Sequence, residues 1–172
     1  MAVGRRACKP GGWEMTLIQQ VEEAAERAAA GGGGPWSIAE ADGAVQVVCD
    51  LTAVETLACA FSRFEVSNQA WAAAPIAAVQ KIADGLAKRL TYLLEPIRPI
   101  ETDQEACIVQ MRSSPPRRSE DRSSYYELQV RRGGVISLCR YEKQPGDVRQ
   151  AVPIEVTREV FRHLLSDFVA AA

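Results

Sequence analysis

Two adjacent glycines, Gly133 and Gly134, separate two alternating segments, and this pattern constrains the fold more than any other in the chain. Residues 124–132 and 135–142 alternate apolar and polar side chains. A two-residue turn between paired strands needs positive φ, which glycine adopts at little cost, so the sequence predicts a β-hairpin. With that turn, the facing pairs are Arg132–Val135, Val130–Ser137, Leu128–Cys139, Tyr126–Tyr141 and Glu127–Arg140. The first four pairs form a mostly apolar face, and the last is a charged pair on the opposite face.

Helical periodicity appears first near the amino terminus. Thr16 and Gln19 have the spacing of a capping box, in which each residue's side chain bonds the other's backbone. Apolar side chains then recur at helical spacing up to the glycine run 31–34. These features predict a helix over residues 16–30.

Two later stretches are also helical in pattern. Pro75 suits a first helical position, and an apolar stripe from there stops before Pro96. The stripe comprises Ile76, Val79, Ala83, Leu86, Leu90 and Leu93. A final amphipathic helix is predicted from about Glu155, with Val160, Phe161, Leu164, Leu165 and Phe168 on its apolar face.

Strand-like alternation fills much of the remaining chain. Residues 36–38 and 45–49 alternate on either side of Asp42-Gly43, which predicts a second tight hairpin. Residues 55–66 alternate with a shift of one position, which predicts a third strand with a bulge, and a helix is the alternative there. The bulge is expected near Ser62-Arg63.

A fourth strand is expected over residues 107–112, after an extended crossing marked by Pro96 and Pro99. The polar segment 113–123 then leads to the glycine hairpin, and its composition predicts a mobile loop within the domain.

The element order is helix, three strands, helix, three strands, helix. It predicts an α+β two-layer sandwich, in which three helices cover one face of a mainly antiparallel sheet of about six strands. This order resembles that of type III secretion chaperones and related small bacterial dimeric proteins, over residues 16–170 and as topology only. No motif accompanies the resemblance, so no family residues are carried over.

The length and composition fit one domain. A chain of 172 residues with 47% hydrophobic residues can bury a sizeable core, so residues 15–172 are expected to form a single domain behind a disordered tail, 1–14. The longest apolar candidate for a bilayer span is interrupted by charges at Lys81, Asp84, Lys88 and Arg89. We therefore expect a soluble, cytoplasmic protein without a membrane partner.

Cysteine usage and charge narrow the function classes. The five cysteines, an odd number, contain no C-x-x-C pair, so a disulfide framework is not expected. The last four lie in apolar alternating segments, and we expect them to be buried reduced thiols instead of metal ligands: Cys49, Cys59, Cys107 and Cys139. A net charge of -2 gives no general attraction to nucleic acid. The arginines of segment 113–123 are offset by Glu120 and Asp121 and lack interleaved aromatic residues, so nucleic-acid binding is not expected.

The strongest candidate site is a polar row on the second face of the predicted sheet. If Arg112 faces Tyr125 in the neighbouring strand, then Gln110, Glu127 and Arg140 form a row across three strands. Two guanidinium groups in such a row can bind a carboxylate or phosphate. The alternative is a solvated surface whose charge pairs contribute little stability.

Other chemical candidates are weaker. His163 has Glu159 and Asp167 on the same side of its helix but no second histidine, so a solvated helix face is the better interpretation, and no metal or other cofactor is expected. The glycine run 31–34 follows a helix and lacks the Lys-Ser/Thr ending of a phosphate loop.

One helical glycine departs from local propensity. Gly85 lies inside a helix, where glycine costs about 1 kcal/mol relative to alanine, so a close neighbour is expected there. It shares a helix flank with Ala78, Ile82 and Arg89. This flank could contact a partner subunit or another helix of the same chain.

These observations lead to two hypotheses. The first is a non-enzymatic, protein-binding or chaperone-like module that forms a homodimer. The second is a small-molecule or anion-binding enzyme centred on Arg112, Glu127 and Arg140.

Overall fold

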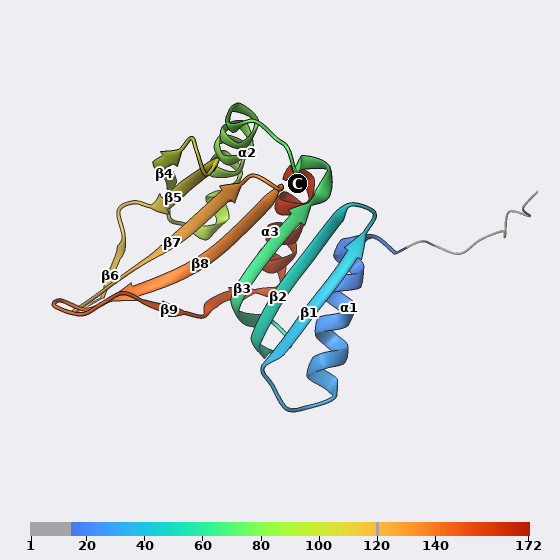
Figure 1. Cartoon of the computed structure of the whole chain (residues 1–172). Helices are drawn as coiled ribbons and strands as arrows, with labels where there is room; N and C mark the ends of the chain where they lie inside the picture. Colours follow the sequence, from blue (N-terminus) through green and yellow to red (C-terminus); the bar gives the residue numbers. More distant parts are fainter. Residues whose placement is uncertain (1–14, 120) are drawn as a thin grey trace, which may run out of the picture.

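A computed structural model describes residues 15–119 and 121–172 of the chain (Figure 1). The predicted tail 1–14 lies outside the described residues, as does Cys8. Within them, no helix is long and apolar enough to cross a bilayer.

The described residues form three α-helices, two short 3₁₀ helices and ten strands. In chain order the elements are α1 (Leu17–Ala30), β1 (Trp36–Asp42), β2 (Val45–Val54), β3 (Ala58–Asn68), η1 (Gln69–Trp71), α2 (Ile76–Arg89), η2 (Leu90–Leu93), β4 (Ile97–Asp103), β5 (Ile108–Ser113), β6 (Arg117–Ser119), β7 (Arg122–Arg131), β8 (Val135–Lys143), β9 (Gln150–Val152), β10 (Ile154–Thr157) and α3 (Arg158–Ala171). The α+β class and its antiparallel sheet are confirmed.

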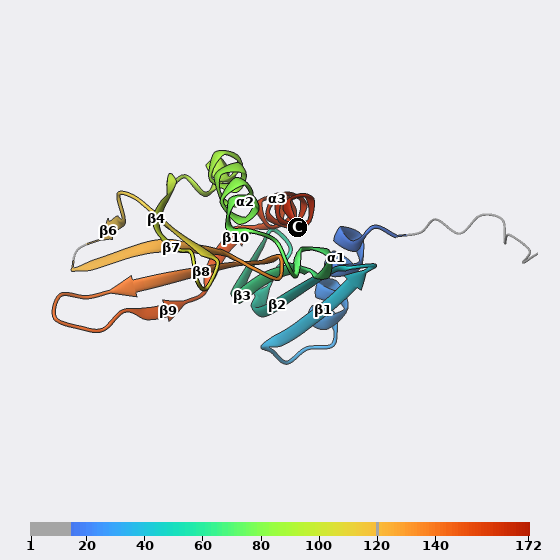
Figure 2. The same cartoon turned by 45° about the horizontal axis from the view of Figure 1, so that its top comes forward.

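A single antiparallel sheet has the strand order β1-β2-β3-β8-β7-β5-β4. The short strands β10, β9 and β6 pair with β3, β8 and β7, respectively. All three helices cover one face, which we call the helix face: α1 packs on β1 and β2, α3 on β3 and β10, and α2 on β4, β5 and β7. Figure 2 shows α2 and α3 side by side above the sheet. The opposite side, toward the viewer in Figure 1, is called the open face.

The hydrophobic core lies between the helices and the sheet. One row of buried side chains crosses six neighbouring strands: Ile38, Cys49, Phe64, Leu138, Leu128 and Met111. From above this row, α3 contributes Phe161 and Phe168, whose rings pack against Phe64 at centroid distances of 6.1 and 4.9 Å. Continuous burial from one strand to the next explains why the alternation in the sequence is so regular.

Two copies of a meander meet at the centre of the sheet. β1, β2 and β3 run inward from one edge, and β5, β7 and β8 run inward from the other side, where β4 forms the edge. β3 and β8 pair over only three residue pairs, from Phe64–Leu138 to Val66–Ile136. Beyond them the two strands separate, and β10 and β9 pair with their freed edges. The main strands follow the predicted order of helix, three strands, helix, three strands, helix, with β4 and the short β6, β9 and β10 as additional strands.

The first helix begins as its sequence predicts. Thr16 Oγ1 accepts a hydrogen bond from the Gln19 amide at 3.3 Å, and the Thr16 amide donates to Gln19 Oε1 at 2.9 Å. This reciprocal capping box satisfies two backbone donors that the helix itself cannot pair.

The predicted register of the glycine hairpin is wrong by one residue. Arg131 pairs with Val135, so the turn has three residues, Arg132 to Gly134. The turn is held from outside the hairpin, because the Arg132 amide donates to the Cys107 carbonyl at 3.0 Å and the Gly133 amide donates to the Trp71 carbonyl at 3.2 Å.

The corrected register changes every facing pair. Leu128 faces Leu138, Glu127 faces Cys139, and Tyr126 faces Arg140. The expected pairs Arg132–Val135, Val130–Ser137, Leu128–Cys139, Tyr126–Tyr141 and Glu127–Arg140 do not form. A shift of one residue moves side chains to the other face of a sheet, and Arg140 therefore lies on the helix face.

Residues 58–68 form a strand, so the helical alternative for the 55–66 stretch is wrong. The expected bulge is present: Asp50 pairs with Arg63 but Leu51 pairs with Phe61, which leaves Ser62 without a partner in the ladder.

Several boundaries also differ from the prediction. The extended crossing contains strand β4, the predicted mobile loop 113–123 contains β6, and α3 begins at Arg158 because the residues before it pair with β3 as β10.

Candidate functional site

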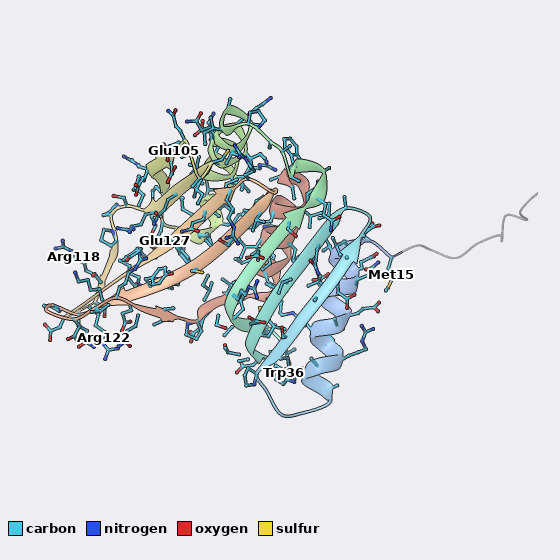
Figure 3. All side chains as sticks on the ribbon, in the orientation of Figure 1. Met15, Trp36, Glu105, Arg118, Arg122 and Glu127 are labelled. Atoms are coloured by element: carbon cyan, nitrogen blue, oxygen red, sulfur yellow. The ribbon has the colours of Figure 1, made fainter. Side chains whose placement is uncertain are left out.

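The open face brings together three of the predicted site residues. Arg112 pairs with Glu127 and not with Tyr125, and its Nη2 donates to Glu127 Oε2 at 3.3 Å. The Arg112 guanidinium also lies over the Tyr125 ring, 4.4 Å from its centroid. Gln110 faces Gln129, farther along the same two strands. Figure 3 shows Glu127 on this face, over β7 and β8.

Arg149, which sequence reasoning missed, completes this cluster. Its Nη1 donates to Glu127 Oε2 at 2.6 Å and to Tyr125 Oη at 3.3 Å, and its guanidinium lies 4.2 Å from the Tyr141 ring centroid. These hydrogen bonds, to Tyr125 and Glu127, raise the pKa of Arg149. Glu127 is only 4% exposed, and two guanidinium groups share its charge. Both cations of the open-face cluster are thus paired with Glu127, and the buried Arg112 Nε has no hydrogen-bond partner among the described residues.

Arg140 lies on the opposite face and belongs to a second cluster. Its Nη2 donates to Glu95 Oε1 at 3.1 Å and to Ser124 Oγ at 2.8 Å, and its guanidinium lies 4.4 Å from the Tyr126 ring centroid. Ser113 Oγ donates to the second Glu95 oxygen at 2.7 Å. The expected row that joins Arg140 to Gln110 and Glu127 is therefore wrong, because the corrected register places Arg140 beside Tyr126.

A pocket of about 640 Å³ opens above the Arg140 cluster. Its polar lining comprises Glu95, Arg117, Tyr126, Arg140 and Glu155. Its apolar lining comprises Leu93, Leu94, Pro96, Pro115, Pro116 and Pro153. Proline fixes φ, so four of these wall residues stand on stiff backbone. We call this hollow the proline-walled pocket.

Leu94, at the edge of this pocket, has a strained backbone conformation and an exposed apolar side chain. It follows η2 with a φ of 60°, a left-handed conformation that side chains other than glycine and asparagine rarely adopt. Its side chain is also 88% exposed. The left-handed conformation ends η2, where the Leu94 amide donates to the Thr91 carbonyl at 3.1 Å, but the exposed side chain adds nothing to the core.

A second hollow of about 570 Å³ adjoins the first. Both are lined by Arg117 and Arg140, and the second is otherwise polar, with Ser119, Asp121, Arg122, Ser124, Glu142 and Gln144. Arg122 donates to Glu142 at 3.1 Å across it. Figure 3 shows Arg118 and Arg122 at the far end of this region.

The predicted flank of α2 has open space above its glycine. A Cβ added at Gly85 would meet only Arg89 Nη2, at 3.6 Å, so no other helix of the described residues comes within 4 Å of that position. Arg89 turns back on the flank, donating from Nε to the Gly85 carbonyl at 3.4 Å. Ala78 and Ile82 are half-buried against the core. The intramolecular explanation for this glycine is wrong, whereas a contact with a second subunit stays a prediction.

The remaining candidates lie apart from both clusters. His163 is exposed, and its ring stands edge-on to Tyr92 at a centroid distance of 5.6 Å. Cys49, Cys59 and Cys107 are buried, and Cys139 is half-buried. Across residues 15–119 and 121–172, no group of three or more His, Cys, Asp or Glu side chains has the arrangement of a metal site.

Comparisons with protein-family models, with curated proteins and with solved structures find no match to this chain. The resemblance to type III secretion chaperones therefore stays a prediction from element order.

Proposed function

We propose that the protein is a non-enzymatic, protein-binding module of chaperone-like type, and that a segment of its partner docks in the proline-walled pocket. The observation that carries this proposal is Leu94, an exposed leucine on strained backbone at the rim of a preformed hollow. Residues with strained backbone cluster at functional sites, and exposed apolar side chains beside a pocket can serve as anchors for partners.

The chemistry of the titratable groups supports binding over catalysis. Burial raises the pKa of the Cys49, Cys59 and Cys139 thiols, so these thiols are protonated at neutral pH and are poor nucleophiles. Burial also raises the pKa of Tyr126, the ring beneath Arg140.

The alternative, an anion-binding enzyme built on Arg112, Glu127 and Arg140, has less support. Arg112 and Arg140 lie on opposite faces of the sheet, so one small anion cannot reach both. Glu127 already occupies Arg112 and Arg149.

The homodimer and the cytoplasmic location belong to the same proposal. The open space above Gly85 leaves room for a second copy on the α2 flank. Light scattering over a wide concentration range tests this part, and Gly85→Glu is expected to shift a dimer toward monomer. A monomeric mass for wild type at every concentration would remove the homodimer but leave the pocket proposal intact.

Selection from a displayed library of random short peptides tests the docking pocket. Wild type is expected to enrich peptides that Leu94→Gly no longer binds, although this variant should be at least as stable, because glycine adopts positive φ freely. Leu57→Gly is the matched control, since Leu57 is 79% exposed but lies outside the pocket. Peptides that bind Leu94→Gly as well as wild type, or no enrichment at all, would overturn the proposal.

A further inference from the structure

Two arginines line both hollows, whereas the carboxylates line one hollow each: Glu95 and Glu155 the first, Asp121 and Glu142 the second. Arg117 and Arg140 are the residues that line both hollows, so two guanidinium groups lie at the junction where the proline-walled pocket meets the second hollow. Both also affect Tyr126: burial raises the pKa of this side chain, and the positive charges of Arg140 and Arg117 oppose the rise.

The Glu95 carboxylate does not satisfy both arginines at this junction. Its two carboxylate oxygens are already engaged, one by Arg140 Nη2 and the other by the Ser113 hydroxyl. Among the described residues, the hydrogen bonds of the Arg140 guanidinium to Glu95 and Ser124 both come from Nη2. Since a guanidinium carries five donors, Arg140 has donors beyond these two that can bond a ligand.

The Arg140 guanidinium is also held in position before any ligand arrives. Its side chain is 13% exposed, it is stacked on Tyr126, and it is tied to Glu95 and Ser124. A fixed, partly desolvated arginine loses little conformational freedom on binding, and it pairs with a carboxylate more strongly than a mobile surface arginine does.

We propose that the partner segment carries a carboxylate directly beside an apolar side chain. The apolar side chain enters the proline-walled pocket next to Leu94, and the carboxylate lies at the junction between Arg117 and Arg140. This inference rests on the proposed function and gives the partner its chemistry: an acidic, extended peptide segment.

The test uses two displayed peptide libraries mixed in equal amounts, both with random flanks. One has a fixed central Leu-Glu pair and the other a fixed Leu-Gln pair, which differ in charge but hardly in shape. Wild-type protein is expected to enrich the Leu-Glu library by about tenfold over the Leu-Gln library, the ratio expected for one charge-assisted contact. The preference should fall as salt is raised.

Two neighbouring arginines provide a matched pair of variants. Arg117→Gln should abolish the preference for Leu-Glu, whereas Arg118→Gln, with the same loss of charge at an exposed position outside the junction, should keep it. Equal enrichment of both libraries by wild type, or an equal effect of the two variants, would overturn the acidic-segment inference and leave the docking pocket standing. If neither library is enriched on wild type, the docking proposal fails, and this inference fails with it.

Discussion

At the tip of the β7–β8 hairpin, Gly134 has a φ of 64° and lies against η1. A Cβ added there would stand 2.6 Å from the Asn68 carbonyl oxygen and 2.9 Å from Trp71 Cβ. Gly43, in the β1–β2 turn, has a similar φ of 58° but nothing within 4 Å of its Cβ position. The two glycines therefore separate the effect of backbone conformation from that of close packing.

We expect Gly43→Ala to lower the free energy of unfolding by about 1 kcal/mol and Gly134→Ala by about 3 kcal/mol or more. The first variant has only the left-handed backbone penalty, whereas the second must also displace η1. Urea denaturation followed by circular dichroism measures both. Equal losses would mean that η1 does not pack on the hairpin tip.

Replacing Glu127 by Gln tests the open-face cluster. The carboxylate is 4% exposed and pairs with two arginines, so its neutralisation is expected to lower the free energy of unfolding by about 1 to 3 kcal/mol. Glu65→Gln is the control, because Glu65 also pairs with two arginines but its side chain is 19% exposed, and about 0.5 kcal/mol is expected there. If chemical denaturation shows the same loss for both variants, burial of Glu127 contributes nothing.

At the scale of elements, the sequence predicted the strands that alternate between a buried and an open side. β4 was not predicted because its residues after Ile97 are exposed and Pro99 interrupts the strand. β9 and β10 were not predicted because strands of three and four residues are too short to show an alternation of apolar and polar residues. The hairpin register was predicted wrongly because its turn is held by hydrogen bonds to Cys107 and Trp71, which are distant in the sequence.

The corrected register makes a sharp prediction for β7. Leu128 is fully buried against Leu138, so Leu128→Ala is expected to cost about 2 to 4 kcal/mol through the cavity that it leaves. Gln129 lies on the open face and is half-buried, and Gln129→Ala should change stability by less than about 0.5 kcal/mol. Similar midpoints for the two variants in urea melts would show that the open face is covered.

At the scale of the whole molecule, the candidate site was the least predictable part. The predicted hairpin register was wrong by one residue and therefore placed Arg140 on the open face. The structure places Arg140 on the helix face, because side chains alternate along a strand. Arg149 follows a Pro-Gly turn and has no pattern that would connect it with Glu127. The proline-walled pocket joins residues near 94, 116, 126, 140 and 154, and only the folded chain brings these together.

Stability at high pH is a further property of the whole molecule. Burial raises the pKa of Cys59 from 9.0 to about 11, and the nearby Arg158 opposes this only in part. The folded protein therefore keeps the proton longer than the unfolded chain. The stabilisation is complete below pH 9.0 and is lost as the pH rises from there through about 11.

Cys59→Val removes this titration while nearly keeping the volume of the side chain. Under reducing conditions, the variant should lose less stability than wild type as the pH rises from 9.0 to about 11. Denaturant titrations at several pH values measure the difference. Parallel stability curves for the two proteins would show that the Cys59 thiol is accessible to water in the folded state.

The three residue pairs between β3 and β8 join two halves that each have their own meander and their own helix. Opening the sheet along this line breaks few backbone hydrogen bonds, whereas opening either half breaks many. The hydrophobic core nevertheless continues across this line, so we expect only the backbone pairing beside it to open more readily, with faster amide exchange there than inside either half. Because β10 pairs with β3 and α3 follows it directly, the segment that joins the halves comes after the strands of both meanders in the chain.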